Sequence, residues 1–388
     1  MTGHARARAA TGTKIATPSP EDLGHQTYVP GILPCGILVA AGCKFIRKGC
    51  VMAPNIAILG ATGAVGLEFL CVLEQRRTPL GTLRLLASAR SAGRKLAFGG
   101  REIVVEEVTA DSFKGINIAL FSAGAAASRT WAPVATAAGA RVVDNSSAFR
   151  MDAGVPLVIP EINPQAIGDA RVIANPNCST IIMNMAVWPL HRVHPVRRIV
   201  VSTYQAASGA GRQAMLELEN QTRDVIAGKP ATPKVFPHPI AFNLFSHNTP
   251  IGEDGYNVEE RKMILETRKI FDAPDLAITA TCIRVPVLRA HSESINLTFE
   301  QPITEEEDRA ILSRAPGVKV VDDRSGNRFP MPIDASGQDE CYVGRIRRDI
   351  SQSDGRGIEL FVSGDQLRKG AALNAVQIAE CMGLRPQG

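Results

Sequence analysis

A glycine-rich turn between an apolar strand and a helix constrains the fold of this chain more than any other feature. Residues 55–59 are a predicted strand and residues 67–73 a predicted helix. The turn that joins them reads Gly60-Ala61-Thr62-Gly63-Ala64-Val65-Gly66, with the spacing G-x-x-G-x-x-G. Glycines at such positions permit a tight turn, close approach of the backbone to a pyrophosphate, and close packing of the helix on the strand. The pattern predicts a Rossmann-like α/β domain with a dinucleotide at this turn.

The next predicted strand, 83–87, indicates which dinucleotide is bound. An Asp or Glu at its end would accept hydrogen bonds from the ribose hydroxyls of NAD, but no acid is present there. The chain continues instead with hydroxyl and cationic residues, among them Ser88, Arg90 and Ser91. Such residues suit the 2′-phosphate of NADP through charge-assisted hydrogen bonds. The alternative is a solvated basic loop, because charge runs are usually surface.

A thiol directly before a predicted helix is the strongest chemical signal. In Asn175-Pro176-Asn177-Cys178-Ser179-Thr180 the cysteine ends an extended segment, and the apolar run 181–188 predicts a helix that starts near Ser179. The first amide groups and the dipole of that helix would lower the pKa of Cys178 and offer N–H donors to a developing oxyanion. The alternative is that Cys178 is a small buried apolar residue, as most free cysteines are.

Composition excludes several classes of protein. With 388 residues, of which 45% are hydrophobic and 21% charged, the chain can bury a large core and form two domains. The net charge of +5 without a dense basic block disfavours nucleic acid as partner and favours an anionic small molecule. No apolar run approaches the ~20 residues of a membrane span. The 8 cysteines show no C-x-x-C spacing or Cys/His cluster, so neither a metal site nor a disulfide framework is expected, and a cytoplasmic location fits best.

Residues 1–53 are expected to lie outside the fold. They mix basic residues with Ala, Thr and Pro, and the strand–helix pattern begins only after them. Three interpretations compete: an upstream start with Met52 as the true initiator, an organelle transit segment, or a poor secretory signal. The first is favoured, because Met52-Ala53-Pro54 directly precedes the first strand.

The remaining chain predicts two domains. Residues 54–178 together with 363–386 are expected to form the dinucleotide-binding domain, and 179–362 a second α+β catalytic and dimerisation domain on a largely antiparallel sheet. Further strands are expected at 116–124, 141–147, 196–204, 275–287, 294–300 and 358–362, with helices at 211–227, 257–271 and 370–380. The last of these helices should return to the first domain.

Several separated motifs together resemble one enzyme family. Besides the glycine turn and the cysteine run, they are Asp144-Asn145-Ser146-Ser147-Ala148-Phe149-Arg150, the run 202–211 that begins Ser202-Thr203-Tyr204-Gln205, Arg284-Val285-Pro286-Val287 with His291, and Lys369-Gly370-Ala371-Ala372-Leu373-Asn374. From about Pro54 to Leu384 the chain resembles aspartate-semialdehyde dehydrogenase of the bacterial type. The resemblance implies that L-aspartyl 4-phosphate is reduced with NADPH to L-aspartate 4-semialdehyde and phosphate, a step towards lysine, threonine, methionine and isoleucine.

The resemblance also implies roles for individual residues. Cys178 would be the nucleophile that forms a thioester, His291 the acid/base, and Gln205 the amide that orients the substrate. Acid/base work suits an imidazole whose pKa lies near neutrality. Arg284 would clamp the α-carboxylate, Glu259 would face the amine, and Arg150, Lys262 and Asn177 would hold the phosphate. Without the resemblance, Glu259 and Lys262 read as a solvated helix face. The matching cofactor positions are Gly60, Ala61, Thr62, Gly63, Ala64, Val65, Gly66, Ser88, Arg90, Ser91, Ser208, Gly209 and Asn374.

Two alternatives stay open. One is N-acetyl-γ-glutamyl-phosphate reductase, which uses similar cysteine chemistry but usually carries Tyr-Pro after the cysteine, where this chain has Ser179-Thr180. The other is a cofactor-binding paralogue without catalysis. By resemblance the chain should also form a homodimer through its second domain.

Overall fold

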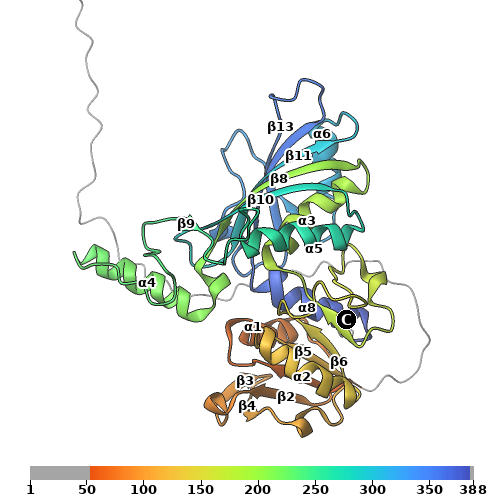
Figure 1. Cartoon of the computed structure of the whole chain (residues 1–388), viewed down its shortest axis with the longest axis vertical. Helices are drawn as coiled ribbons and strands as arrows, with labels where there is room; N and C mark the ends of the chain where they lie inside the picture. Colours follow the sequence, from red (N-terminus) through yellow and green to blue (C-terminus); the bar gives the residue numbers. More distant parts are fainter. Residues whose placement is uncertain (1–52, 385–388) are drawn as a thin grey trace, which may run out of the picture. The chain divides into compact units, whose positions relative to one another are not determined.

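The computed structural model describes residues 53–384, which belong to one compact unit. The expectations for the first 52 residues therefore lie outside the described part of the chain. Two seven-stranded sheets organise the described residues, and Figure 1 shows them with their helices.

The first sheet has the strand order β3-β4-β2-β1-β5-β6-β7. All its neighbours are parallel except β3 and β4, so it is a parallel sheet with one antiparallel edge strand. Its elements are β1 (Ile56–Leu59), α1 (Ala64–Gln75), β2 (Leu83–Ala87), β3 (Lys95–Phe98), β4 (Arg101–Glu107), β5 (Ile118–Phe121), α2 (Ala125–Ala137), β6 (Arg141–Asp144) and β7 (Val172–Ala174). The central strands β1 and β5 are buried along their whole length, as strands covered on both faces must be.

The last helix, α8 (Leu373–Cys381), packs in the core of this first sheet. Its apolar side chains, such as Val376 and Ile378, share one buried cluster with Ile58 of β1 and Leu85 of β2. The chain therefore returns to its first sheet after building the second, as the sequence indicated. A π-type turn, η5 (Arg368–Ala372), directly precedes α8.

The second sheet is mixed, with the order β12-β13-β14-β11-β8-β10-β9. Four of its neighbour pairs are antiparallel, whereas β8 pairs with β10 and β12 with β13 in parallel. Its elements are α3 (Cys178–His191), β8 (Val196–Gln205), α4 (Arg212–Ile226), β9 (Phe245–Ser246), α5 (Val258–Phe271), β10 (Ala277–Arg284), β11 (His291–Phe299), α6 (Glu305–Leu312), β12 (Val318–Val320), α7 (Pro332–Ala335), β13 (Cys341–Arg348) and β14 (Gly357–Gly364).

Helices cover one face of this sheet and leave the other open. Along β8, Ile199, Val201 and Thr203 are buried, while the alternate residue Tyr204 keeps 39% of its surface exposed. Ile199 and Val201 join residues of α3, α5 and α6 in the largest apolar cluster of the described chain. Figure 1 shows α3 and α5 lying against β8, β10 and β11. The solvent-exposed face of such a sheet is a surface that a symmetric dimer can bury.

Some predicted boundaries were wrong by a few residues. Helix α3 begins at Cys178 rather than Ser179, because Asn177 forms its N-cap. Strand β10 ends at Arg284, before Pro286, which has no N–H to continue the ladder. Strand β11 begins at His291, three residues before the predicted start.

Candidate active site

Cys178 is the first residue of α3, and the residue before it organises the helix start. Asn177 Oδ1 accepts hydrogen bonds from the backbone N–H groups of Ser179 (3.0 Å) and Thr180 (3.2 Å). These two amides are therefore occupied and are not free donors for an oxyanion, which corrects the expectation drawn from the helix start. The cap still aligns the positive end of α3 with the sulfur.

The thiol of Cys178 is half-buried, and its surroundings favour the neutral form. Burial raises the pKa of Cys178 to about 12, and the carboxylate of Glu259 acts in the same direction. The guanidinium groups of Arg284 and Arg150 and the ammonium of Lys262 oppose this shift. The predicted low pKa is therefore wrong for the site without substrate. The same contributions place all four charged groups within electrostatic reach of the sulfur.

His291 lies at the start of β11 with its ring fully buried. The backbone N–H of Ala206 donates to His291 Nδ1 at 3.0 Å. Because a backbone amide can only donate, Nδ1 carries no proton and the neutral ring is protonated at Nε2. Nε2 is buried and has no hydrogen-bond partner in the described part of the chain. This ring therefore presents an unused N–H donor.

The predicted near-neutral pKa of His291 is also wrong. Burial lowers the pKa of this imidazole to about 3, and the charge of Arg284 acts in the same direction. A second proton would have to reside on Nδ1, against the Ala206 N–H. The resting group at neutral pH is thus an uncharged donor.

Arg284, the last residue of β10, is a buried cation without a carboxylate partner. Only 5% of its surface is exposed. Its Nη1 donates to the carbonyl oxygen of Ala206 at 3.3 Å, and Nε has no partner. Within residues 53–384 no carboxylate forms an ion pair with it. Because a buried unpaired charge is costly, this guanidinium is suited to an anionic ligand.

Gly209 lies against both groups. A Cβ atom on this residue would stand 2.9 Å from His291 Cε1 and 3.0 Å from Arg284 Nη1. The neighbouring Ser208 is buried, and its hydroxyl accepts a hydrogen bond from Gln366. Gly209 thus lies beside His291 and Arg284, and the sequence assigns both Ser208 and Gly209 to the cofactor.

One face of α5 supplies the acidic and basic groups of the site. Glu259 and Glu266 are buried and Lys262 is partly exposed, so the interpretation of this segment as a solvated face is wrong. Glu259 accepts hydrogen bonds from Lys262 Nζ at 3.0 Å and Asn177 Nδ2 at 2.8 Å. Burial would raise the pKa of Glu259, but Lys262, His247 and these hydrogen bonds lower it to about 2. The carboxylate is therefore ionised throughout the working range of pH.

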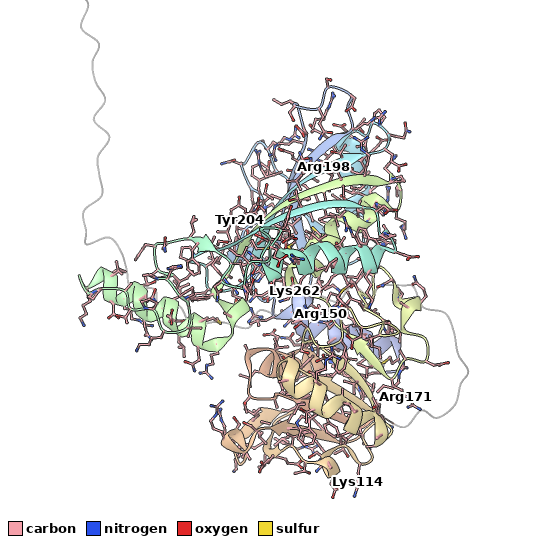
Figure 2. All side chains as sticks on the ribbon, viewed as in Figure 1. Lys114, Arg150, Arg171, Arg198, Tyr204 and Lys262 are labelled. Atoms are coloured by element: carbon pink, nitrogen blue, oxygen red, sulfur yellow. The ribbon has the colours of Figure 1, made fainter. Side chains whose placement is uncertain are left out.

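Arg150, which follows β6 in the chain, contacts the same face of α5. Its Nη1 pairs with Glu266 Oε1 at 3.0 Å, and its Nε donates to the carbonyl of Asn175 at 2.9 Å. Glu266 Oε2 accepts the backbone N–H of Asn177 at 2.6 Å. Figure 2 labels Arg150 and Lys262 in the region of α5. Arg150 is thus partly committed to holding the residue before the nucleophile, and only its remaining N–H groups can reach a ligand.

Gln205 ends β8 beside the nucleophile helix. Its Nε2 donates to the hydroxyl oxygen of Ser179 at 2.9 Å. The side chain is almost completely buried. The amide therefore lies one residue from Cys178, in the neighbourhood that the sequence indicated.

The glycine turn has the geometry that a pyrophosphate requires. Gly60 has a φ of +89°, and a Cβ on Gly66 would lie 2.2 Å from the carbonyl oxygen of Gly60. Gly63 caps α1 without a side-chain hydrogen bond, so the N–H groups of the first turn stay available to an anion. The residues present at this turn fit a dinucleotide.

The loop after β2 reaches this turn. Thr62 Oγ1 donates to Ser91 Oγ at 3.4 Å. Ser88 caps the short helix η1 (Ala89–Ser91), and Arg90 within it is exposed with no ion pair in the described chain. A free cation and two hydroxyls thus stand beside the turn.

Asn374 is held by hydrogen bonds from several segments of the chain. Its amide hydrogens are used by the carbonyl of Val158 (3.0 Å) and by Asn175 Oδ1 (2.7 Å). Its Oδ1 accepts from the buried Lys369 Nζ at 2.8 Å, and Lys369 also pairs with Glu161 at 2.6 Å. This side chain is fully buried and bonds to three other residues of the described chain.

Three further residues belong to the site but escaped the sequence analysis. Gly370 in η5 lies against Cys178, Glu266 holds Arg150 and Asn177, and His247 lies beside Arg284 and Glu259. Glu266 had a readable signal, because it is four residues after Lys262 and seven after Glu259 and therefore on the same helix face. No local pattern distinguished His247.

Comparison with known proteins identifies the family. Residues 55–170 match the semialdehyde dehydrogenase NAD binding domain, and residues 187–369 match the semialdehyde dehydrogenase dimerisation domain. The chain belongs to the semialdehyde dehydrogenase family. It is therefore an oxidoreductase with a nicotinamide-dinucleotide domain of Rossmann type and a second domain on a mixed sheet, which confirms the predicted fold class.

Named relatives confirm the resemblance to aspartate-semialdehyde dehydrogenase. The protein of that name from Synechocystis is 56% identical over 84% of this chain and 97% of its own length. The Aquifex aeolicus protein is 50% identical over 85% of this chain and 98% of its own length. A crystal structure of aspartate semialdehyde dehydrogenase II from Vibrio cholerae, complexed with ASA, has 43% identity and a TM-score of 0.83, covering 86% of this chain and 99% of that chain.

Residues 53–384 contain neither a membrane-spanning helix nor a cluster of metal-binding side chains. No helix in this range is both long and apolar enough to cross a membrane. The same residues contain no group of three or more His, Cys, Asp or Glu side chains arranged to hold a metal ion.

Proposed function

We propose that this enzyme carries out the NADPH-dependent reductive dephosphorylation of L-aspartyl 4-phosphate to L-aspartate 4-semialdehyde, through a thioester on Cys178. The observation that carries the proposal is the buried guanidinium of Arg284, which has no carboxylate partner and lies within electrostatic reach of Cys178. A small substrate with its own carboxylate supplies the missing partner. This product leads towards lysine, threonine, methionine and isoleucine.

Each charged end of aspartyl phosphate has a matching group. Arg284 can hold the α-carboxylate with two parallel hydrogen bonds. The ionised Glu259 can pair with the ammonium group. Lys262 and the free N–H groups of Arg150 offer positive charge to the phosphate. Asn177 supports this end indirectly, because its side chain is bonded to α3 and to Glu259.

The raised pKa of Cys178 decides how its proton leaves. At neutral pH the resting group is a thiol, and His291 Nε2 already carries a proton. The sulfur attacks the acyl carbon as the C–O bond to phosphate breaks, and the thiol proton leaves with the phosphate oxygen. Acyl phosphate and thiol thus become thioester and hydrogen phosphate, with atoms and charge in balance. Lys262 and Arg150 stabilise the departing group.

His291 acts on the oxygen of the reacting carbon. When bound, NADPH supplies the hydride that reduces the thioester carbon. The carbonyl oxygen then gains negative charge, and the unused Nε2–H of His291 donates to it. Collapse of the tetrahedral adduct releases the aldehyde and the Cys178 thiolate, which takes a proton from water. The neutral ring serves this role without titrating.

NADP rather than NAD is the proposed cofactor. Gly60, Gly63 and Gly66 would hold the pyrophosphate at the start of α1. The exposed Arg90, with Ser88 and Ser91, would contact the 2′-phosphate. No acidic side chain stands after β2 to select the ribose of NAD.

The second domain is proposed to form a homodimer through the open face of its sheet. The half-exposed Tyr204 and the partly exposed Phe361 pack against each other on this face, with tilted rings whose centroids are 6.1 Å apart. A match to a dimerisation domain over 187–369 supports the same assignment. Mass measurement in solution tests it, and a monomer at micromolar concentration would contradict it.

An activity assay tests the reaction. The purified chain should reduce NADP when given L-aspartate semialdehyde and phosphate, and omission of phosphate should abolish the signal. Cys178→Ser should bind NADP normally but lose turnover, because a serine alkoxide is neither available nor a good leaving group. Activity of this variant within tenfold of wild type would contradict the thioester. A preference for N-acetyl-glutamate semialdehyde would assign the alternative reductase instead.

A further inference from the structure

His247 is a buried imidazole to which the chemistry above gives no role. It follows β9, and its backbone N–H donates to the carbonyl of Cys282 at 2.8 Å. Phe245 pairs with Arg284 across β9 and β10. Because side chains alternate along strands, His247 shares the face of Arg284 rather than the opposite face. The imidazole is thus fixed beside the candidate carboxylate clamp.

The hydrogen bonds around this ring are compatible with a proton on Nε2. His247 Nδ1 lies 3.3 Å from Thr249 Oγ1, and the same hydroxyl oxygen accepts the backbone N–H of Glu259 at 3.2 Å. The hydroxyl can accept this N–H and still donate its own hydrogen to Nδ1, and in that arrangement the ring proton lies on Nε2. Burial lowers the pKa of His247 to about 4, and Arg284 acts in the same direction, so the ring is a neutral donor at working pH.

The Nε2–H of His247 has no acceptor among the described residues. The residue is 7% exposed, and this nitrogen is not among the buried atoms, so it keeps contact with solvent. Arg284, Glu259 and Lys262 all influence the pKa of the ring, which places it within electrostatic reach of the three charged groups. A neutral donor next to Arg284 can bond a carboxylate without repelling the guanidinium.

We propose that His247 is a further substrate-binding residue whose Nε2–H donates to the α-carboxylate clamped by Arg284. This inference rests on the proposed function, because it requires the amino-acid substrate to lie between Arg284 and Glu259. His247 would then help to select substrates that carry a carboxylate at this position. It would not contact the phosphate or the dinucleotide.

Two substitutions at His247 test the hydrogen bond. His247→Phe keeps an aromatic ring but removes the donor, whereas His247→Gln keeps an N–H group. A hydrogen bond to a charged group is worth about tenfold or more in affinity, so His247→Phe should raise KM for L-aspartate semialdehyde by at least about tenfold. His247→Gln should recover most of this loss. KM for phosphate and for NADP should stay within about threefold of wild type in both variants.

His194→Phe is the matched control, because it makes the same exchange beyond the end of α3 that lies opposite Cys178. If His247 binds substrate itself, this control should change KM for the semialdehyde by no more than about threefold. The inference is overturned if His194→Phe matches His247→Phe, if Gln restores nothing, or if KM for phosphate rises equally. A wild-type enzyme without turnover would overturn the proposed function together with this inference. An active wild type with an unaffected His247→Phe variant would overturn the inference alone.

Discussion

Gly370 lies so close to Cys178 that a Cβ atom on the glycine would stand 3.0 Å from the Cβ atom of the nucleophile. The glycine is in the π-type turn that precedes α8, and Lys369 beside it is anchored to Glu161. Such turns recur at functional sites. The backbone of the returning C-terminal segment, at Gly370, thus packs against the side chain of Cys178, the first residue of α3.

Gly370→Ala should therefore impair catalysis more than folding. The added methyl group presses on Cys178 and on the Cβ of Gln366, 3.3 Å away, so the sulfur must shift by a few tenths of an ångström. Small misplacements of a reacting group are costly, and kcat should fall about tenfold with little change in Tm or in NADP binding. Gly252→Ala is the matched control, because the atoms nearest to its Cβ would belong to the guanidinium of Arg261, at the end of a flexible side chain. Equal kcat values for the two variants would show that the packing does not position the thiol.

Glu266→Gln should destabilise the protein. The carboxylate pairs with the buried Arg150 at 3.0 Å and accepts the N–H of Asn177 at 2.6 Å. Removing its charge leaves a buried guanidinium unpaired, which costs about 3 kcal/mol of unfolding free energy. Glu219→Gln, in the exposed pair with Arg223, should cost under about 0.5 kcal/mol. Urea unfolding of both variants measures the difference, and similar values would mean that Arg150 finds another partner.

Local features of the fold could be read from the sequence. The strand Leu83–Ala87 has its predicted bounds, and the turn from Gly60 to Gly66 has its predicted form. Both depend on residues that are neighbours in the chain, so periodicity and glycine spacing suffice. The helical periodicity of α5 places Glu266 on the same face as Glu259 and Lys262, so the sequence alone could have indicated Glu266 as a site residue.

Properties that depend on tertiary packing could not be predicted in this way. The helix start indicated an acidic thiol, but burial of Cys178 raises the pKa of its thiol to about 12. The near-neutral pKa expected for His291 fails for the same reason, together with the bond from Ala206. His247 reaches the site only because β9 pairs with β10. Long-range contacts set these properties, and no local pattern encodes them.

Arg90→Ala should weaken NADP selectively. The side chain is exposed beside the glycine turn and has no ion pair in the described chain, so its charge is available to a 2′-phosphate. KM for NADP should rise about tenfold, while KM for NAD changes by less than about twofold. Arg101→Ala, an exposed substitution on β4, should leave both values unchanged. Parallel increases for NADP and NAD would indicate that Arg90 is ordinary surface.

Arg284→Lys should damage catalysis although it keeps the charge. One ammonium group cannot reproduce the two parallel hydrogen bonds of a guanidinium to a carboxylate. We expect kcat/KM for L-aspartate semialdehyde to fall about a hundredfold, with KM for NADP unchanged. Nearly full kcat/KM in the lysine variant would show that Arg284 does not clamp the substrate.

Asp308 should make the protein less stable as pH rises. This buried carboxyl of α6 has no hydrogen-bond partner for either oxygen among the described residues. Burial raises its pKa from 3.8 to about 7, and Glu307 adds to the shift. Between these values the folded state keeps a proton that the unfolded chain has released. The contribution of Asp308 to the free energy of unfolding therefore falls as pH rises from about 4 to 7, and it does not change further above pH 7.

Asp308→Asn should remove this dependence. Relative to wild type, the variant should gain up to about 4 kcal/mol of unfolding free energy at pH 8, because about three pKa units no longer oppose folding. At pH 4 the two proteins should differ little, since Asp308 is protonated in the folded wild type. Glu306→Gln, whose side chain is 83% exposed on the same helix, serves as control and should show no such contrast. Urea unfolding at both pH values measures the difference in unfolding free energy between each variant and wild type. An equal gain at pH 4 and pH 8 would mean that packing, rather than ionisation of Asp308, limits stability here.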